Sequence, residues 1–143
     1  MNIGELSHQT GVPAKTIRHY EAEGLLRPAR APNGYRQFSE DDRRRLQFVV
    51  RARALGFGLA DCAELLELFD DQSRQSRDVK AIAARHLARV DDDLAALQRM
   101  REQLLLLVTA CAGDQGAACP ILDDLAAGST KLPVDRLFRL TPQ

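Results

Sequence analysis

Apolar residues recur every three or four positions from Arg77 to Val108, with charged residues between them, and the stretch contains neither proline nor glycine. This pattern predicts one amphipathic helix of about 48 Å, at roughly 1.5 Å per residue. Val90, Leu97 and Leu104 are spaced by seven, which is the repeat of a coiled-coil seam that a second chain must cover. A core helix of a larger monomeric bundle is the alternative, but no other segment is long enough to line it. The expected dimer-interface residues are Leu87, Val90, Leu94, Leu97 and Leu104.

Two shorter helices are predicted at the N-terminus. Asn2 and Glu5 have the spacing of a capping box, which starts a helix that Gly11 ends. Pro13 opens a second helix that runs to Gly24. Two such helices joined by a tight turn form a helix-turn-helix, whose second helix enters the DNA major groove, although a helical hairpin with a solvated basic face fits the same pattern. The side chains expected to face DNA are Lys15, Thr16, Arg18, His19 and Tyr20.

A β-hairpin is predicted next. Asn33-Gly34 is the dipeptide most typical of a type I′ turn, and the residues from Tyr35 to Phe38 return as the second strand. A hairpin beside the second helix is the wing of a winged helix-turn-helix. Tyr35 and Arg36, near its tip, carry a hydroxyl and a guanidinium, and both groups suit phosphate oxygens.

Two further helices complete a predicted domain over residues 1–70. Ser39 and Asp42 form a second capping box, and the helix that they start is expected to end at Gly56. The next helix runs from about Ala60 to Phe69 and carries a cysteine on its apolar face, interpreted as a small hydrophobe. The inward-facing residues expected on the two helices are Leu46, Val49, Val50, Leu55, Leu59, Cys62, Leu65, Leu66 and Phe69.

The formal charge of the chain is zero, but it is unevenly divided. Residues 1–58 carry ten Lys and Arg against six Asp and Glu, a balance of +4, and residues 59–143 carry ten against fourteen, a balance of −4. The basic part is therefore the one expected to meet a polyanion. Because the chain has no apolar run of about eighteen residues and no basic start followed by an apolar core, we expect no membrane span, no export signal and a cytoplasmic protein.

Cys111 and Cys119 enclose a short loop after the long helix. Thiolates are soft ligands that select Cu(I) and its heavier relatives, and two of them satisfy such an ion. Structural zinc takes four ligands, whereas this loop holds no histidine and a single acid, Asp114. Pro120 is expected to open a short helix whose N-terminal amides favour a thiolate. Two unrelated thiols, or a redox pair that closes the loop, are the alternatives.

The run from Thr16 to Leu26, followed by Asn33-Gly34-Tyr35-Arg36, resembles the signature of the MerR family of transcriptional regulators, and the resemblance covers roughly residues 1–126. It implies a mainly α homodimer, with a winged helix-turn-helix and a long antiparallel coiled-coil dimerisation helix. It also implies that the dimer binds double-stranded promoter DNA, distorts it and so activates transcription by RNA polymerase. By position, the DNA contacts that the resemblance implies are Lys15, Arg18, Tyr20, Tyr35, Arg36 and, on the DNA backbone, Arg53.

The run from Cys111 to Pro120 resembles the metal-binding loop of the copper-efflux regulator (CueR-like) branch, in which two cysteines bind a monovalent coinage-metal ion linearly. The resemblance implies one Cu(I), Ag(I) or Au(I) ion per protomer, held by Cys111 and Cys119. Divalent-ion branches carry a further cysteine, donated by the partner chain, near the start of the dimer helix. Ser76 stands at that position here and is expected beside the metal site, because a neutral hydroxyl is too hard to complete a zinc or mercury site.

The sequence thus predicts a transcriptional activator of coinage-metal resistance genes in four parts. Residues 1–70 form the winged helix-turn-helix, 76–108 the dimerisation helix, 109–128 the metal-binding loop and short helix, and 129–143 a tail, either disordered or docked through one apolar turn. An enzyme is not expected, since no carboxylate pair, no nucleophile with a base and no phosphate-cradling loop is present. The remaining alternatives are a thiol-redox sensor, a regulator responding to Zn(II) or Hg(II), and a metal carrier, which would not need the winged module.

Overall fold

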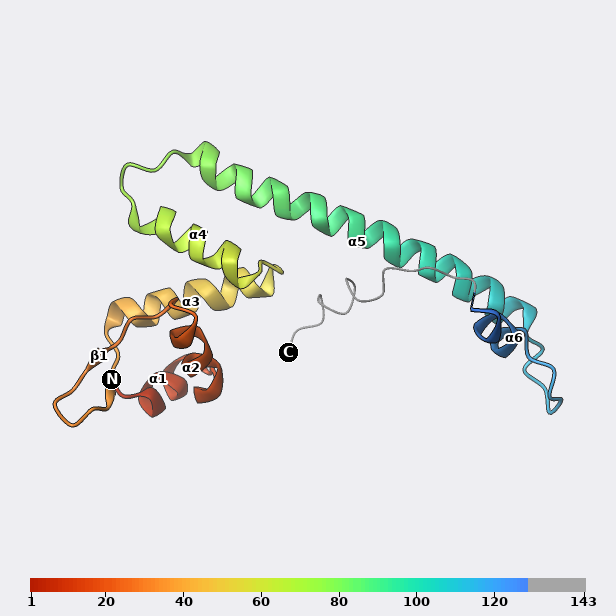
Figure 1. Cartoon of the computed structure of the whole chain (residues 1–143), viewed down its shortest axis with the longest axis horizontal. Coiled ribbons are helices and arrows are strands. Elements are labelled where there is room, and N and C mark those ends of the chain that lie inside the picture. The colour runs from red at the N-terminus through yellow and green to blue at the C-terminus, as the bar shows by residue number, and fades with distance from the viewer. Residues whose placement is uncertain (129–143) are drawn as a thin grey trace. The chain divides into compact units, whose positions relative to one another are not determined.

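The computed structural model describes residues 1–128, which form six helices and one two-stranded hairpin (Figure 1). The chain divides into two compact units, Met1–Ala84 and Arg85–Gln143. No helix among the described residues is long and apolar enough to cross a membrane. The tail predicted over 129–143 lies outside the described residues. The predicted mainly α fold, a winged helix-turn-helix followed by a long helix, is confirmed.

The helix-turn-helix consists of α1 (Ile3–Thr10) and α2 (Ala14–Ala22). The predicted capping box is present, because the Glu5 N–H donates to Asn2 Oδ1 at 2.8 Å and the Asn2 N–H donates to Glu5 Oε2 at 3.2 Å. Gly11 ends α1 at φ 74°, a left-handed conformation that glycine adopts without a Cβ clash. The turn between the helices is therefore short, and the two helices pack against each other.

The wing is an antiparallel pair of short strands, β1 (Ala29–Arg30) and β2 (Arg36–Gln37). Its turn differs from the predicted type I′ geometry, which needs positive φ at both central residues. Only glycines have positive φ among the described residues, and here that residue is Gly34, at 83°. The Gly34 N–H donates to the Ala31 carbonyl at 2.8 Å, which places Pro32 and the following asparagine at the centre of the turn. Pro32 fixes φ near −65°, so the chain forms a three-residue loop with the glycine as a bulge.

Two packed helices, α3 (Glu40–Ala54) and α4 (Leu59–Asp70), follow the wing in the first unit, which also contains the start of the next helix. The predicted Ser39–Asp42 capping box is present, with the Asp42 N–H donating to Ser39 Oγ at 3.1 Å. The same carboxylate is almost fully buried and accepts from the Arg27 N–H at 3.3 Å, which joins the start of α3 to the segment after α2.

A single core holds the first unit together. Its buried residues are Leu6, Val12, Ile17, Tyr20, Leu25, Leu26, Phe38, Leu46, Val49, Ala52, Cys62 and Leu66. Fully burying a leucine side chain contributes about 1.5–3 kcal/mol, so this cluster is the main source of stability. Three residues expected inside are exposed instead, namely Val50, Leu55 and Phe69. Val50 follows the buried Val49 and points to another side of α3, and Leu55 lies just beyond the end of that helix. Phe69 packs against Phe48 at the edge of the core, with ring centroids 5.2 Å apart.

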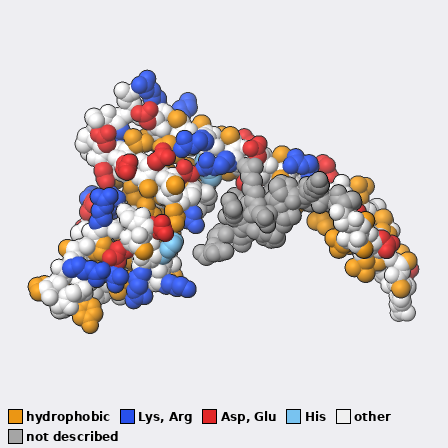
Figure 2. Space-filling view, in the orientation of Figure 1, with side chains coloured by type: hydrophobic (Ala, Val, Ile, Leu, Met, Phe, Trp, Pro, Cys, Tyr) orange, Lys and Arg blue, Asp and Glu red, His pale blue; other side chains and the backbone are white. Residues whose placement is uncertain are grey.

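The long helix α5 runs from Ser76 to Ala110, and α6 (Pro120–Ala127) follows the cysteine loop. The predicted helix was two residues too short at its C-terminal end, and its expected N-cap, Ser76, is instead its first helical residue. Hydrophobic side chains gather on the C-terminal part of α5 and on α6 (Figure 2). The large exposed ones are Leu87, Leu94, Leu97, Leu104, Leu105, Leu106, Val108, Leu122 and Leu125.

Candidate nucleic-acid interface and metal-binding loop

Helix α2 turns one face to the core and another to solvent. Lys15, Arg18 and His19 are exposed and Thr16 is half-buried, as expected for side chains that reach into a groove. Tyr20 differs from them, because it is only 8% exposed and belongs to the core, so it offers little surface to a groove and its DNA contact stays a prediction. Positions three apart on a helix share a face, and Tyr20 therefore follows the buried Ile17 inward.

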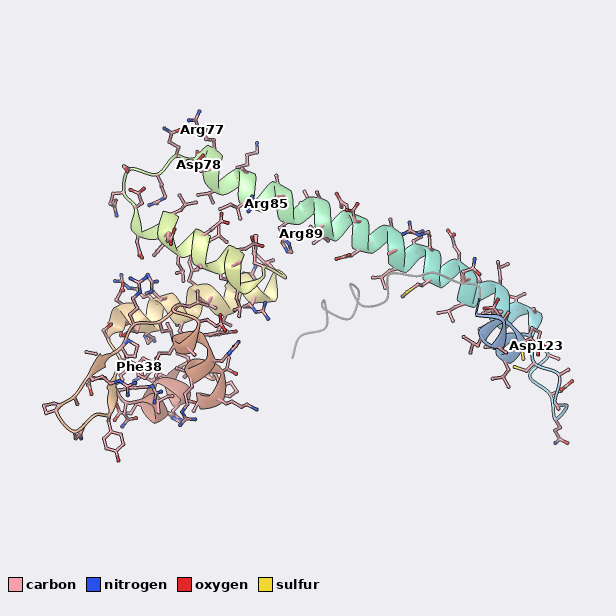
Figure 3. All side chains as sticks on the ribbon, in the orientation of Figure 1. Phe38, Arg77, Asp78, Arg85, Arg89 and Asp123 are labelled. Atoms are coloured by element: carbon pink, nitrogen blue, oxygen red, sulfur yellow. The ribbon has the colours of Figure 1, made fainter. Side chains whose placement is uncertain are left out.

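The wing presents an aromatic side chain at its tip. Tyr35 is 73% exposed, and its N–H is held by the Asn33 side chain at 3.1 Å. The base of the wing is fixed to the N-terminal segment, where the Phe38 N–H donates to the Met1 carbonyl at 2.7 Å and the Met1 ammonium donates to the Phe38 carbonyl at 2.9 Å. Phe38, labelled in Figure 3, is itself buried in the core. The tip is thus exposed to a ligand, while two hydrogen bonds hold the base to the N-terminal segment.

The second helix of the helix-turn-helix, α2, is called the recognition helix. It and the wing enclose a hollow of about 540 Å³. It brings three of the predicted DNA contacts together, Arg18 from α2 with Tyr35 and Arg36 from the wing. Lys and Arg side chains gather along this edge of the first unit in Figure 2. The complete lining is Asn2, Ile3, Arg18, Ala31, Asn33, Tyr35, Arg36 and Gln37.

Glu21 of α2 binds both strands of the wing. Its carboxylate accepts from Arg36 Nε and lies 3.7 Å from a terminal nitrogen of Arg30, whose other terminal nitrogen donates to the Gly34 carbonyl at 3.1 Å. The Glu21 side chain is only 17% exposed and that of Arg36 31%. Sequence reasoning missed Glu21, although an acid beside the inward-facing Tyr20, on a helix otherwise carrying exposed cations, was an available signal. Arg36 therefore orients the wing in addition to any phosphate contact.

The arginines of α3 are mostly engaged within the protein. Arg43 and Arg44 pair with acids one helical turn earlier, at 2.9 and 3.2 Å. Arg45 reaches out of the helix to other elements. Arg53, the predicted contact to the DNA backbone, is exposed and donates to the Phe57 carbonyl at 3.1 Å, where it helps to end α3.

The predicted dimer-interface residues lie on the exposed apolar face of α5. Leu87, Leu94, Leu97 and Leu104 are exposed in the protomer and Val90 is half-buried. Further along, the face is hollowed into an open groove of about 440 Å³, lined by Leu97, Met100, Arg101, Leu104, Leu105 and Val108. Monomeric proteins rarely expose a contiguous apolar surface of this kind.

Cys111 and Cys119 mark the two ends of the loop between α5 and α6. The Cys111 N–H continues the α5 pattern by donating to the Leu107 carbonyl at 3.1 Å. Cys119 is the N-cap of α6, and Pro120 follows at the first helical position. The N–H of Asp123, a residue labelled in Figure 3, donates to the Cys119 carbonyl at 3.1 Å. A thiolate at Cys119 would lie at the positive end of the helix dipole.

Both loop cysteines are free thiols and partly exposed. The only acid within the loop, Asp114, accepts from the Gly116 N–H at 2.8 Å and so shapes the turn. Among residues 1–128, no three or more His, Cys, Asp or Glu side chains are grouped so as to hold a metal ion. One protomer thus offers two thiols at the ends of this loop, and their thiolates are soft ligands.

The two remaining residues considered for sulfur or metal chemistry lie in the first unit. Ser76 is exposed at the start of α5, and its role beside a metal stays a prediction. Cys62 is fully buried in the core, as predicted, and burial raises the pKa of its thiol. It is a packing residue, because a buried neutral thiol is a poor nucleophile and a poor metal ligand.

Comparison with known proteins covers most of the chain. The profile of the MerR HTH family regulatory protein matches residues 1–68, and that of MerR, DNA binding, matches residues 43–107. Heavy metal-dependent transcription regulator 2 of Rhizobium meliloti (strain 1021) is 44% identical over 94% of this chain and 92% of its own length. The HTH-type transcriptional regulator CueR of Salmonella typhimurium (strain LT2) is 42% identical over 88% of this chain and 92% of its own length. The crystal structure of the regulator PbrR691 from Ralstonia metallidurans CH34, in complex with lead(II), has a TM-score of 0.78 at 33% identity and covers 87% of this chain and 98% of that one.

Proposed function

Because the chain belongs to the MerR family of helix-turn-helix regulators, we propose that it activates coinage-metal resistance genes in response to Cu(I), Ag(I) or Au(I). As a member of this family it is a DNA-binding transcription factor and not an enzyme. The relatives include a heavy metal-dependent regulator and a lead(II)-bound regulator, so metal response in general has broader support than response to any one ion.

The DNA-binding part of the proposal rests on the hollow between recognition helix and wing. Arg18 on α2 is exposed and suited to a guanine edge, while Tyr35 and Arg36 on the wing are suited to phosphates. Each protomer reads one half-site, and a homodimer therefore reads a pseudo-palindromic promoter. Activation is proposed to follow from distortion of that promoter, which presents it to RNA polymerase.

The dimer part rests on the uncovered apolar face of α5. Leu97 and Leu104 lie seven residues apart on this face and line the same groove. A second copy of α5, running antiparallel, would bury both rows of leucines in a coiled coil. This arrangement also provides the two DNA readers that a symmetric promoter needs.

The observation that carries metal specificity is the pair of thiols at the ends of one loop, without a third donor among the described residues. Cys111 and Cys119 would hold the ion. Two thiolates and one univalent cation leave a net charge of −1, which the positive N-terminal end of α6 can offset. Structural zinc takes four ligands, and Ser76 offers only a neutral hydroxyl. A thiol-redox sensor with a disulfide between Cys111 and Cys119 is the second candidate function, favoured by the partial exposure of both thiols.

Metal binding can be tested on the reduced protein without knowledge of the promoter. Titration with Cu(I), Ag(I), Zn(II) and Hg(II) under anaerobic conditions should give one tightly bound Cu(I) or Ag(I) per protomer and much weaker Zn(II) binding. Cys111→Ser and Cys119→Ser should each abolish tight binding, whereas Cys62→Ala should not. Zn(II) binding as tight as Cu(I) binding would favour the divalent alternative. Absence of metal binding, together with ready formation of the intramolecular disulfide, would favour the redox alternative.

A further inference from the structure

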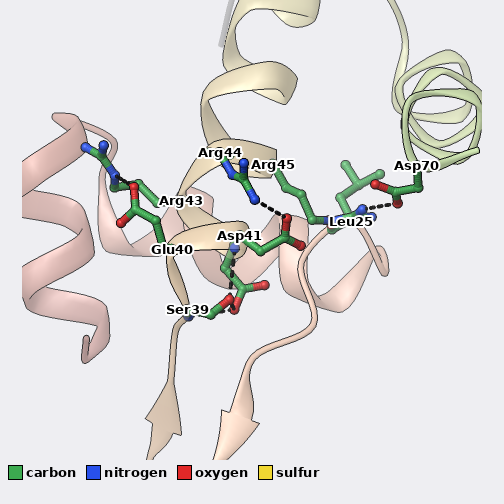
Figure 4. Close-up of polar contacts among 9 residues, drawn as sticks. Leu25, Ser39, Glu40, Asp41, Arg43, Arg44, Arg45 and Asp70 are labelled. Atoms are coloured by element: carbon green, nitrogen blue, oxygen red, sulfur yellow. Dashed lines mark hydrogen bonds and ion pairs between the residues drawn. The ribbon is translucent and has the colours of Figure 1, made fainter. Parts of the chain in front are cut away.

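Arg45 differs from its neighbours on α3 because its side chain leaves the helix. Only 12% of that side chain is exposed. Its Nε donates to the Leu25 carbonyl at 3.2 Å, and one terminal nitrogen donates to Asp70 Oδ2 at 2.5 Å (Figure 4). One guanidinium thus joins segments that lie 20 residues before it and 25 residues after it in the chain.

The two partners of Arg45 lie at functionally different places. Leu25 is buried just past the end of the recognition helix, and its N–H donates to the Tyr20 carbonyl at 2.9 Å. Its carbonyl therefore moves with α2. Asp70 is the last residue of α4, immediately before the segment 71–75 that leads into α5. Arg45 therefore connects the C-terminal end of the recognition helix α2 to the segment 71–75, which we call the α4–α5 joint.

The joint itself is ordered by local hydrogen bonds. Asp71 accepts from the Ser73 N–H at 2.9 Å and from the Ser73 hydroxyl at 2.6 Å. Arg74 donates to the Phe69 carbonyl at 3.3 Å and to the Asp71 carbonyl at 3.1 Å, which satisfies acceptors at the end of α4. A segment braced in this way can pass on a displacement, whereas a flexible linker would absorb it.

Electrostatics explain why an arginine is needed at this place. Asp70 lies at the negative end of the α4 dipole, and the last turn of α4 contains no basic residue. Two arginines from outside α4 supply cations at this end: Arg74 contacts the Phe69 carbonyl, and Arg45, from a neighbouring helix, contacts the Asp70 carboxylate. Arg43 and Arg44, by contrast, pair with acids on α3 itself (Figure 4), and the Arg44 and Asp41 side chains are 67% and 63% exposed. Such exposed pairs within one helix support only that helix.

We propose that Arg45 is a positioning residue that couples the α4–α5 joint to the recognition helix, so that a displacement at the start of α5 is delivered to the DNA reader. This proposal rests on the proposed function, because it assumes that an effector changes the state of α5 while the protein stays on DNA. The coupling requires both contacts. Loss of the Asp70 contact should therefore uncouple the switch without removing any DNA-contacting group.

The test compares Arg45→Met and Asp70→Ala with Arg44→Met, which removes an arginine from the same helix but leaves both Arg45 contacts intact. Full-length protein is measured for operator affinity, for Ag(I) affinity and for the ratio of transcription with and without Ag(I), on an operator selected from randomised DNA. Arg45→Met and Asp70→Ala should lower the induction ratio about 5-fold or more, the lower range of allosteric coupling. Operator and Ag(I) affinities should stay near those of Arg44→Met. The induction ratio of the double variant should be no lower than that of Arg45→Met, because Arg45→Met already breaks the one contact that Asp70→Ala removes.

A normal induction ratio in Asp70→Ala would overturn the proposal. So would a fall of induction that only parallels a loss of operator affinity or of thermal stability, since a purely structural role predicts that pattern. If Arg45→Met does not fold, Asp70→Ala decides, because Asp70 is half exposed and alanine suits a helix end.

Failure of the proposed function gives a different result, namely a wild-type protein that no metal induces. The coupling is then judged by hydrogen exchange of the operator complex. Arg45→Met should speed exchange in both 24–27 and 70–75 and leave α1 unchanged. Faster exchange in only one of the two segments, or in neither, would overturn the proposal.

Discussion

The carboxylate of Glu21 on the recognition helix holds Arg36 on the wing, so the two elements that face DNA are joined by an ion pair between them. The same carboxylate also attracts Arg30 on the other strand of the hairpin. The angle between recognition helix and wing is therefore fixed before DNA arrives, which lowers the entropy cost of binding.

Glu21→Gln should reduce operator affinity, because the amide can keep at most one weak hydrogen bond to the wing. We expect a loss of about 1 kcal/mol, roughly 5-fold in Kd, as for a partly exposed ion pair. Glu23→Gln is the matched control, since it removes the same charge from an exposed position just past the end of α2. The two variants are compared by fluorescence anisotropy on one operator, and equal Kd values would show that the wing does not depend on Glu21.

Replacement of Arg18 and replacement of Arg36 should weaken operator binding in different ways. Arg18→Ala should cost about 1–3 kcal/mol and relax the preference for one base pair, if Arg18 reads a base edge. Arg36→Ala should weaken binding to all sequences about equally and, where it also loses a phosphate contact, flatten the salt dependence. Affinities for single-base operator variants at several salt concentrations distinguish these outcomes. A changed base preference in Arg36→Ala, with none in Arg18→Ala, would reverse the roles assigned to helix and wing.

Leu97→Asp should dissociate or unfold the dimer, because it places a carboxylate at an apolar position of the α5 face in each protomer. Operator affinity should fall with it, since each protomer reads one half-site. Gln98→Asp is the control, an exposed position next in sequence but outside the seven-residue seam. Sedimentation that finds an intact Leu97→Asp dimer would place Leu97 outside the interface.

The buried thiol and the two loop thiols should be alkylated at very different rates. Burial raises the pKa of Cys62 and removes it from solvent, so alkylation with iodoacetamide should be slow there and fast at Cys111 and Cys119. Stoichiometric Ag(I) should protect the two loop thiols and leave the slow rate at Cys62 unchanged. Mass spectrometry of the digested protein measures all three sites together. Protection of only one loop cysteine would argue against a shared ion.

The features that the sequence predicted correctly depend on neighbours in the chain. Both capping boxes, the glycine that ends α1 and the proline that opens α6 are local, and their geometry follows from residue types a few positions apart. The hairpin was placed correctly, but Pro32 determined its turn more strongly than the Asn33-Gly34 pair did. The loop between α5 and α6 was also placed correctly, whereas metal binding by Cys111 and Cys119 stays a prediction.

The features that the sequence did not reveal depend on partners distant in the chain. Tyr20 carries a polar group but fills the core, because its helical position places it beside Ile17. The sequence marks Glu21 and Arg45 as ordinary surface charges, since their partners lie 9 to 25 residues away. Periodicity gives the inner face of a helix but not how far the neighbouring elements extend over it, which is why the inward positions of Val50 and Phe69 were wrong.

The central claim, that two thiolates select a monovalent ion and so switch transcription, is tested most directly with Cys119→Ser. Serine is a favourable N-cap, so the substitution should preserve the start of α6 and remove only the soft ligand. Transcription from the operator is measured for wild type and variant with Cu(I), Ag(I), Zn(II) and Hg(II). We predict that Cu(I) and Ag(I) induce the wild type, that Zn(II) does not, and that the variant binds the operator normally but responds to none of them. A variant still induced by Cu(I), or a wild type induced as strongly by Zn(II), would contradict the claim.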